Sequence, residues 1–535
     1  MFEMESLYHH LALLFFLFLV VKILFRHKQN LPPSPFALPI IGHLHLFKHP
    51  LSLRTLSSQY GPILLLKFGC RSILVVSSPS AVEECFTKND IIFANRPQSM
   101  SGDHLTYNYT AFVWAPYGHL WRSLRRISVI ELFASKSLQK SSTICGEEVC
   151  SLLRRLLKAK NGVTAKVDLK FLFSLLAYNV MMRLAAGKPC IDEEVAGTKV
   201  EKQLFQEFKE RFSPGLGMNI CDFIPILRLI GYKGLEKSMK KLQSTRDKYL
   251  QHLIDEIRAR RTSSSSKTAK QWKTEGKSSV IETFLSLQDL EPEFLTDTVI
   301  KSVIMYFTIE ATLVWLALGT RGDITASCMM FVAGTETSAI TLEWAMALLL
   351  DHPEAMQKLK AEIDEHVGHG RLLNESDIAK LPYLRCVIKE TLRLYPPAPL
   401  LLPHFSSGAC TVGGFDIPQG TTLMVNAWAM HRDPKLWEES NEFKPERFEA
   451  GLGEQEGFKY IPFGTGRRVC PGASMGLQIV SFALGALVQC FEWDKVGPAP
   501  EDMSPSRSGI TLSKAKPLEA LCCPRRDLIT LLHHP

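Results

Sequence analysis

The most hydrophobic stretch of the chain lies close to its N-terminus. Residues 11–25, LALLFFLFLVVKILF, are apolar except for Lys22, and a basic Arg-His-Lys sequence follows them. This run is slightly short for a membrane span, but apolar neighbours and a Lys22 side chain that reaches the interface extend it. A cleaved signal peptide would begin with basic residues and end with small ones, whereas this start is acidic and this end is bulky and basic. We therefore predict a single-pass membrane anchor over residues 1–29, with the rest of the chain in the cytoplasm.

The pattern after the anchor predicts a rigid connection and then two strands. Residues 30–47 contain closely spaced prolines, which exclude a helix and favour a stiff, extended hinge. Residues 61–79, GPILLLKFGCRSILVVSSP, contain two short apolar runs separated by a turn at Gly69, as two paired strands do. Strand and turn residues return over residues 411–425.

Helical periodicity covers most of the remaining chain. It dominates up to about Pro396, and a last helix follows Cys470. A polar segment with few aromatic residues, residues 261–279, is predicted to be a mobile loop. The sequence therefore predicts a mainly α protein with a smaller β portion, and we place its main domain at residues 48–535.

Composition narrows the class of protein only slightly. Of the 535 residues, 46% are hydrophobic and 22% are charged, so a large core is available and global disorder is excluded. The net charge of +8 comes without a dense basic stripe, so a membrane surface or an acidic protein fits better than a nucleic-acid partner. The 13 cysteines form no C-x-x-C pair, which disfavours a disulfide framework or a zinc site and favours a reducing compartment.

One cysteine stands in an unusual loop. Cys470 lies in PFGTGRRVCPG, residues 462–472, where three glycines allow the backbone to approach a flat group closely. A cysteine thiolate is a soft ligand for iron, and the nearby Arg468 can pair with a carboxylate. Taken alone, Cys470 would be better explained as a buried, inert thiol.

The complete spacing of this loop is more specific. Phe463, Gly466, Arg468, Cys470 and Gly472 satisfy F-x-x-G-x-R-x-C-x-G, and the loop resembles the haem-binding loop of the cytochrome P450 superfamily. The resemblance implies the cytochrome P450 fold, with haem b as the cofactor and Cys470 as the axial ligand of its iron. It also implies that the other four residues contact the cofactor.

A second pair of segments resembles the same family. Glu390 and Arg393 in KETLRLYPP lie three residues apart on one helix face, and FKPERF supplies Arg447 further along the chain. Alone, the first two residues would be explained as an exposed ion pair of little energetic value. The resemblance instead implies that all three residues form a buried structural lock.

Two further segments supply implied contacts of the haem propionates. WRSLRR matches the family pattern W-x-x-x-R and gives Trp121 and Arg125. His404 in LLPHFSS stands where the family has a basic residue near a propionate.

AGTETS, residues 333–338, resembles the oxygen-binding stretch of the long central helix of the family. Gly334 weakens the helix and can open a groove beside the iron. Glu336 and Thr337 form an acid–alcohol pair that would deliver protons during oxygen activation. The alternative is a plain helix in which the Thr337 hydroxyl bonds back to a carbonyl group.

Three other segments, NRP, YNYT and APYGHLW, resemble more narrowly the plant microsomal enzymes of the isoflavone-hydroxylase-like group. The resemblance implies a monooxygenase of the endoplasmic reticulum membrane with a cytoplasmic catalytic domain. Electrons would come from NADPH through NADPH-cytochrome P450 reductase, and one oxygen atom from O2 would enter a small apolar or phenolic substrate of specialised metabolism. The implied partners are the reductase, membrane lipid, the substrate and O2, without nucleic acid.

Two other functions stay open. One is an inactive or non-catalytic membrane haem protein. The other is a family member that rearranges a peroxide or dehydrates its substrate without a reductase. The Glu336–Thr337 pair argues against this last function, because such enzymes do not need to protonate dioxygen.

The sequence departs from the family pattern in the central helix. Residues 305–327, MYFTIEATLVWLALGTRGDITAS, separate DTVIKSVI from CMMFVAGTETS, which the family would join within one helix. The inserted Gly319 and Gly322 disfavour a continuous helix. We prefer a retained intron or a gene-model error, because the flanks join sensibly without the insertion. A tolerated bulge and a second membrane contact are the alternatives.

Deletion of residues 305–327 is expected to raise both haem content and turnover. The deletion rejoins the central helix, and it removes apolar side chains such as Trp315 that would otherwise be exposed beside it. Haem content is measured from the carbon monoxide difference spectrum, and turnover is measured in membranes that contain the reductase. A full-length chain that is as active as the deletion variant would show that the insertion is a real and tolerated element.

Overall fold

The computed structural model of the protein describes residues 30–47, 51–132, 135–158, 164–191, 201–205, 218–262, 279–306, 332–454, 457–506 and 511–525. The anchor predicted at residues 1–29 lies outside these ranges. So does most of the insertion predicted at residues 305–327, of which only Met305 and Tyr306 are described. The described ranges are mainly helical with a smaller β portion, which confirms the predicted balance of helix and strand.

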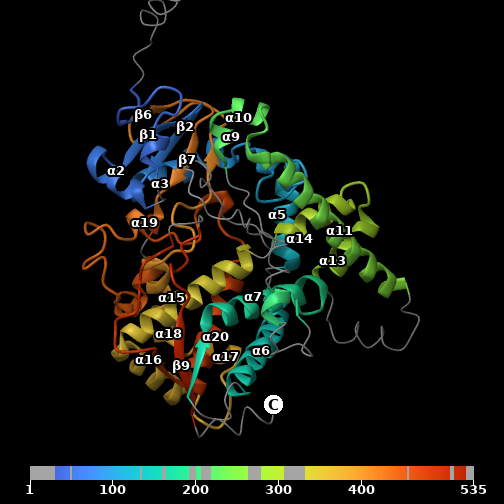
Figure 1. The fold of residues 1–535 in the computed structure, drawn as a ribbon, viewed down its shortest axis with the longest axis vertical. Coiled ribbons are helices and arrows are strands. Elements are labelled where there is room, and N and C mark those ends of the chain that lie inside the picture. Colours follow the sequence, from blue (N-terminus) through green and yellow to red (C-terminus); the bar gives the residue numbers. More distant parts are fainter. Residues whose placement is uncertain are drawn as a thin grey trace, which may run out of the picture.

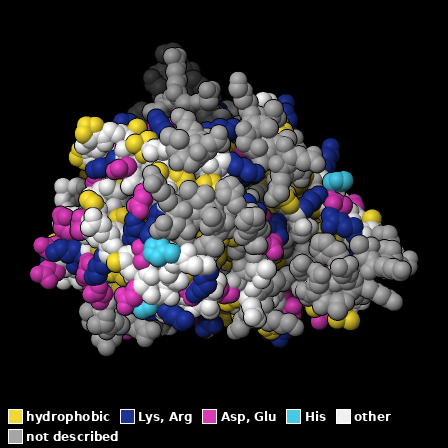
Figure 2. Space-filling model, turned by 90° about the horizontal axis from the view of Figure 1, so that it is seen from below, with side chains coloured by type: hydrophobic (Ala, Val, Ile, Leu, Met, Phe, Trp, Pro, Cys, Tyr) yellow, Lys and Arg dark blue, Asp and Glu magenta, His cyan; other side chains and the backbone are white. Residues whose placement is uncertain are grey.

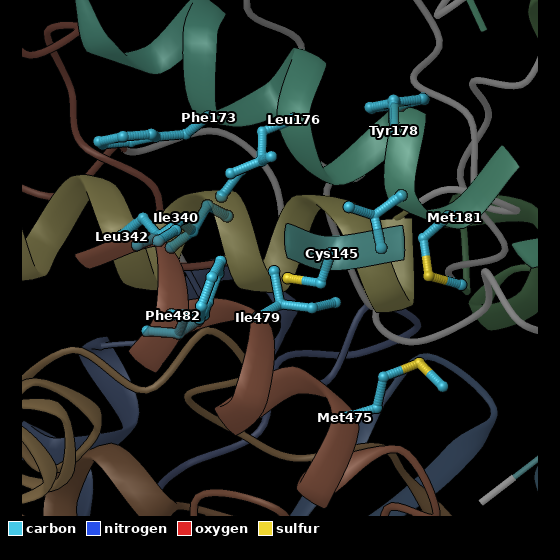
Figure 3. Packing of buried hydrophobic residues seen from close by; sticks show 14 of the residues in the cluster. Cys145, Phe173, Leu176, Tyr178, Met181, Ile340, Leu342, Met475, Ile479 and Phe482 are labelled. Carbon is cyan, nitrogen blue, oxygen red and sulfur yellow. The ribbon is translucent and has the colours of Figure 1, made fainter. Parts of the chain in front are cut away.

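Long helices form the centre of the molecule (Figure 1). They are α6 (Ser135–Lys158), α7 (Leu169–Ala186), α15 (Thr337–Asp351) and α20 (Ala473–Cys490). Figure 3 shows Phe173 and Leu176 of α7 on one side of α15, and Ile479 and Phe482 of α20 on the other. Because α15 is covered on both sides, its sequence is apolar all round.

Two of these helices, α7 and α20, are long and apolar enough to cross a membrane by composition alone. Most of each helix is buried inside the protein, as expected for the core helices of a large domain. They are the only helices of this kind in the described ranges. The anchor prediction therefore depends on residues 1–29 and not on the helical core.

The other helices surround this core. α16 (Pro353–His366), α17 (Glu375–Ile378) and α18 (Pro382–Leu394) pack beside α20, whereas α11 (Leu235–Thr262), α13 (Val280–Leu290) and α14 (Asp297–Tyr306) form a group at the right of Figure 1. The remaining helices are α2 (Ser52–Tyr60), α3 (Pro79–Phe86), α4 (Met100–Leu105), α5 (His119–Leu132), α9 (Ile220–Phe223), α10 (Ile226–Leu229) and α19 (Ala427–Met430). The tighter helical turns are η1 (Leu44–Leu46), η2 (Ile92–Ala94), η4 (Tyr232–Gly234), η6 (Pro445–Glu454), η7 (Gly457–Lys459) and η8 (Gly466–Arg468).

The loop predicted at residues 261–279 is shorter than expected at both ends. α11 continues to Thr262, and the Ser279 hydroxyl caps α13 by accepting the Glu282 N–H. Residues 263–278 lie outside the described residues.

The main sheet joins the beginning of the chain to its last third. Its strands are ordered β1 (Ile63–Phe68), β2 (Arg71–Val76), β7 (Thr422–Val425) and β4 (His404–Phe405). β1 and β2 are antiparallel around Gly69, whose φ is +54°, and β2 pairs with β7 in parallel. The strands predicted at residues 61–79 are thus confirmed, as is strand structure within residues 411–425.

Two smaller sheets complete the β portion. One contains β3 (Ala165–Asp168), β9 (Glu519–Pro524) and β8 (Phe491–Lys495), in that order. The other is the hairpin of β5 (Cys410–Val412) and β6 (Phe415–Ile417).

The proline-rich residues 30–47 run along the main sheet. The Leu65 N–H donates to the Pro33 carbonyl at 3.1 Å, and the Asp416 N–H donates to the Asn30 carbonyl at 2.8 Å. Phe36 and Ile40 nevertheless leave about four fifths of their surface in solvent, at 80% and 81%. This stretch therefore combines a backbone held by the sheet with outward-facing apolar side chains.

The next described element after α14 is a π-helical turn. The turn, η5, covers Val332–Glu336 and leads directly into α15. Residues 307–331, which include all but two residues of the predicted insertion, lie between α14 and η5 and outside the described residues.

Charged side chains of both signs are interspersed on the face shown in Figure 2. Exposed ion pairs, such as Lys166 Nζ with Glu519 Oε2 at 2.8 Å, contribute little to stability because water screens them. Buried charges, such as those between α18 and the chain after α19, are therefore expected to contribute more to the fold.

Glu390 and Arg393 of α18 form a buried ion pair with no exposed side-chain surface. Arg393 Nε donates to Glu390 Oε2 at 2.6 Å, and a second Arg393 nitrogen donates to Glu390 Oε1 at 2.8 Å. Arg447 Nε in η6 donates to Glu390 Oε1 at 3.2 Å. Glu390 therefore contacts both arginines of the lock that the resemblance implied.

Arg393 also holds the backbone that follows α19. Its guanidinium donates to the carbonyl groups of His431 at 2.6 Å, Ser440 at 2.7 Å and Glu442 at 3.1 Å. All five N–H groups of the guanidinium are thus used. The charge is buried without an unsatisfied donor, which is the condition under which such a group is tolerated.

Replacement of Glu390 by alanine is expected to lower the free energy of unfolding by about 3–5 kcal/mol, because it leaves the Arg393 charge buried and unpaired. Urea unfolding followed by circular dichroism measures this loss. Glu519→Ala, which breaks the ion pair with Lys166 where both side chains are 50% exposed, is the matched control and should change stability by less than about 1 kcal/mol. Equal effects of the two substitutions would contradict a special role for the buried pair.

Candidate active site

The loop that carries Cys470 is shaped by two glycines. Gly464 and Gly466 have φ values of +72° and +73°, in the left-handed region that other residues avoid. A Cβ atom on Gly466 would lie only 2.9 Å from Asp90 Oδ1 and 3.0 Å from Phe86 Cδ1. Gly466 begins the η8 turn, from which the chain continues to Cys470. The two glycines therefore fix the path of the loop.

Arg467 fastens the same loop to the chain before η2. Its Nε lies 2.5 Å from Asp90 Oδ2, and its backbone N–H donates to Asp90 Oδ1 at 3.3 Å. A terminal guanidinium nitrogen of Arg467 donates to the Tyr117 hydroxyl at 3.0 Å. These contacts hold the outer side of the loop.

Cys470 follows η8 and is half-buried. Its backbone N–H donates to the Phe463 carbonyl at 3.0 Å, which closes the loop on itself. α20 begins three residues later, with Gly472 at its N-cap. Because the N-terminus of a helix carries partial positive charge, this position favours a negatively charged group such as a thiolate.

Arg468 is buried behind the loop. Its guanidinium donates to the carbonyl groups of Ala94 at 2.5 Å, Val113 at 3.0 Å and Ala115 at 2.6 Å. It also lies 4.8 Å above the ring centre of Trp121 in α5. Trp121 and Arg468, which were selected from distant motifs, are therefore direct neighbours.

Arg125 reaches the loop from the same helix as Trp121. It lies one helical turn after Trp121 in α5, so both side chains are on the same helix face. A terminal nitrogen of Arg125 donates to the Val469 carbonyl at 2.9 Å, next to Cys470 in the chain. α5 and the Cys470 loop are thus fixed to each other.

His404 in β4 lies in a strongly positive environment. Its Nδ1 donates to the Phe93 carbonyl at 2.8 Å, and its ring packs edge-on against Phe86 with the ring centres 4.8 Å apart. Burial lowers the pKa of His404 well below its usual range, and the charges of Arg96 and Arg468 lower it further. The ring is therefore neutral, with its proton on Nδ1 and a lone pair on Nε2.

Arg96 is the cation that motif analysis did not select. Its guanidinium is buried and donates to the carbonyl groups of Leu402 at 3.2 Å, Pro403 at 2.6 Å and Val113 at 3.2 Å. Arg468 donates to the same Val113 carbonyl, so the two arginines converge. In the sequence, the NRP segment that contains Arg96 only supported the resemblance to the plant enzymes. Its local pattern did not predict that the Arg96 side chain is buried.

The second group of site residues lies in η5 and the start of α15. Gly334, Thr335 and Glu336 belong to the π-helical turn, a distortion that is frequent at functional sites. The Ser338 hydroxyl donates to the Gly334 carbonyl at 2.9 Å. The Thr511 hydroxyl donates to Glu336 Oε1 at 3.5 Å, so the C-terminal segment reaches this carboxylate. Thr337 begins α15.

The structure brings the residues of the first group together. Trp121, Arg125, His404, Gly466 and Arg468 all contact the Cys470 loop or the residues directly against it. The contacts of Glu336 lead instead to Thr511, and motif analysis missed Thr511 because it lies in a segment without a recognisable pattern. The candidate residues thus form two groups with separate contacts, one around the Cys470 loop and one in the π-helical turn.

The chemistry of these groups fits haem. The Cys470 thiol suits an iron ion, and the guanidinium groups of Arg96, Arg125 and Arg468 suit the two carboxylates of the porphyrin. The Thr335 hydroxyl is fully buried and has no hydrogen-bond partner within the described part of the chain. A buried polar atom of this kind is expected where a protein faces a bound molecule.

Comparison with known proteins gives a consistent result. The family model for cytochrome P450 matches residues 32–313 and 320–521, and the intervening residues 314–319 fall within the stretch predicted as an insertion. Cytochrome P450 81Q32 from Catharanthus roseus is 45% identical over 507 residues, which cover 94% of this chain and 93% of that protein.

Two other plant proteins align over a similar extent. (+)-Piperitol/(+)-sesamin synthase CYP81Q2 from Sesamum radiatum is 40% identical, with 99% of each chain covered. Isoflavone 2'-hydroxylase from Medicago truncatula is 39% identical over 514 residues, with 95% of each chain covered. The resemblance found in the motifs is thus confirmed along nearly the whole chain, which belongs to the cytochrome P450 family as a monooxygenase of its plant isoflavone-hydroxylase-like group.

Proposed function

We propose that the protein is a membrane-anchored haem-thiolate monooxygenase that hydroxylates or otherwise oxidises a small apolar or phenolic plant metabolite. The observation that carries the proposal is the Cys470 loop, in which a thiol, left-handed glycines and buried arginines meet. Haem b, when bound, supplies the activation of O2 at its iron. In the overall reaction one oxygen atom enters the substrate and the other leaves as water, with two electrons from NADPH and two protons.

The residues around the loop would hold the cofactor. Cys470 binds the iron as a thiolate, which the N-terminus of α20 favours. Arg125 and Arg468 bind the propionates, and Trp121 supports Arg468 through its ring. Gly466 and Gly472 let the backbone approach the porphyrin, and Phe463 closes the loop through its carbonyl.

Arg96 joins the propionate-binding residues in this proposal. Its guanidinium lies beside that of Arg468, and His404 is kept neutral mainly by its burial, with the two positive charges lowering its pKa further. A neutral His404 would contribute a polar surface near a propionate, and the arginines would supply the charge.

Glu336 and Thr337 of the second group would manage protons. A carboxylate and a hydroxyl at adjacent positions can pass a proton from solvent toward the reacting oxygen. The Thr511 hydroxyl supports the Glu336 carboxylate, and Gly334 in the π-helical turn leaves space beside these groups. The groups proposed to move protons thus belong to a different segment from the proposed thiolate.

The names of the relatives support the substrate class. Two of them are named for isoflavone hydroxylation or for sesamin synthesis, which are reactions of phenolic plant compounds. We infer a substrate of comparable size and polarity, oxidised with electrons that a membrane-bound NADPH-cytochrome P450 reductase supplies.

Apolar residues of the described surface support attachment to the endoplasmic reticulum membrane. Phe36 and Ile40 are exposed in the proline-rich stretch, and Leu229 and Ile230 at the end of α10 are 87% and 70% exposed. α9, next to α10, bonds to the β1–β2 turn through the Phe223 carbonyl, so α10 lies near the main sheet that holds the proline-rich stretch. These side chains would rest in the membrane interface beside the anchor at residues 1–29.

Replacement of Cys470 by alanine is expected to abolish the thiolate-type absorption of the reduced carbon monoxide complex, because the iron loses its sulfur ligand. The spectrum is recorded on membranes that contain the full-length chain. Cys70→Ala is the control, since Cys70 is exposed on the β1–β2 turn and should leave the spectrum unchanged. A Cys470→Ala variant with the wild-type spectrum would rule out this ligand.

A chain that begins at Leu31 is expected to partition less into membranes and to keep its haem. It lacks the apolar run at residues 11–25 but retains every described residue that contacts the Cys470 loop. Membrane flotation and the carbon monoxide spectrum measure the two properties. Residual membrane binding should fall further when Leu229 and Ile230 are replaced by serine. Loss of haem on truncation alone would show that residues 1–30 are part of the fold.

A further inference from the structure

His431 connects the buried ion pair of α18 to the Cys470 loop. The residue follows α19 and has no exposed surface. Its backbone carbonyl accepts a hydrogen bond of 2.6 Å from Arg393. On its other side, its ring Nε2 accepts the backbone N–H of Ile461 at 3.1 Å. One residue thus contacts both the lock and the residue directly before the loop.

The direction of these hydrogen bonds fixes the state of the ring. Because a backbone N–H can only donate, Nε2 of His431 must carry a lone pair, and the single ring proton is on Nδ1. Burial and the charges of Arg393 and Arg432 lower the pKa of His431 to about 3, so the ring stays neutral at physiological pH. Nδ1 has no hydrogen-bond partner among the described residues. Among the described residues, the hydrogen bond that Nε2 accepts from Ile461 is therefore the one polar contact of the His431 ring.

Ile461 is a sensitive point for the geometry of the loop. It directly precedes Pro462, and its carbonyl accepts the Gly464 N–H at 3.0 Å. The Phe463 carbonyl, two residues further along the chain, accepts the Cys470 N–H at 3.0 Å. Two hydrogen bonds, one from Gly464 to Ile461 and one from Cys470 to Phe463, therefore connect the position of Ile461 to that of Cys470.

We propose that His431 is a positioning residue for Cys470, which acts by accepting the Ile461 N–H and so joining the Glu390–Arg393 pair to the residue directly before the thiol-bearing loop. The proposal rests on the proposed role of Cys470 as the iron ligand. Packing alone would not explain a histidine here, because an aromatic residue without an acceptor would fill the same space and leave the Ile461 N–H buried without a partner. Tyr460, whose ring centre lies 5.6 Å from that of His431, supplies packing already.

Three substitutions of His431 distinguish the effect of its hydrogen-bond acceptor from the effect of its ring volume. His431→Gln can place an amide oxygen near the position of Nε2 and keep the acceptor. His431→Asn is too short to reach Ile461, and His431→Phe keeps the ring without an acceptor. Each variant is made in the full-length chain, and the ratio of thiolate-type to thiol-type absorption is measured for its reduced carbon monoxide complex.

The Asn and Phe variants are expected to lower this ratio by roughly tenfold, the change that loss of one buried hydrogen bond produces, whereas the Gln variant should stay near the wild type. Hydrogen–deuterium exchange of residues 460–464 should accelerate in the Asn and Phe variants only. If Asn and Phe variants accumulate without haem while the Gln variant binds it, the need for an acceptor is equally supported.

Other outcomes overturn the proposal. A Phe variant with the wild-type ratio would show that the ring only fills space. Equal losses in all three variants would show that histidine acts through its shape and not through Nε2. A wild-type chain without any thiolate-type absorption would refute the proposed role of Cys470 itself, which keeps that failure distinct from failure of the His431 proposal.

Discussion

The Glu390–Arg393 ion pair places two full charges where neither side chain has exposed surface. The surrounding chain makes this possible because it supplies hydrogen-bond partners to both side chains. Burying charge is unfavourable unless every donor and acceptor finds a partner. Arg393 therefore draws the carbonyl groups of His431, Ser440 and Glu442 toward α18, and Glu390 draws the Lys444 N–H and the Arg447 guanidinium. The irregular chain between α19 and η6 takes its course largely from these demands.

Buried charges near the Cys470 loop also have hydrogen-bond partners, but these partners are backbone carbonyl groups. Arg468 and Arg96 are buried, and each donates to several backbone carbonyl groups in segments that are remote in sequence. Carbonyl groups satisfy the geometry of a guanidinium but do not neutralise its charge. Burial lowers the pKa of the neighbouring His404, and the charges of Arg96 and Arg468 lower it further, so an anionic group would be favoured beside these arginines.

Motifs could select the residues at the centre of the candidate site because these residues are close in sequence. The spacing from Phe463 to Gly472 contains both the thiol and the glycines that shape its loop, and KETLRL contains both members of the buried pair. The apolar runs at residues 61–79 likewise predicted β1 and β2, since strand pairing across one turn is local.

The remaining features arise from contacts between distant segments. Arg96 is recognisable as a buried charge only once Leu402 and Pro403 lie beside it, and the role of Thr511 depends on its approach to Glu336. The π-helical turn at Val332–Glu336 was equally hidden, because AGTETS is compatible with an ordinary helix containing one glycine. Local pattern carries no information about such pairings.

The parallel pairing of β2 with β7 has a consequence for biosynthesis. Residues 73–76 bond to residues 422–425, so the main sheet cannot close until most of the chain has been made. At ordinary rates of translation, β2 waits roughly tens of seconds with one edge open, and open apolar edges invite wrong partners. α3 packs near this sheet and is synthesised directly after β2, and Val82 and Cys85 of α3 share a buried cluster with Leu74. The apolar face of the first strands therefore has a neighbouring helix available early in synthesis, whereas the open edge of β2 waits for β7.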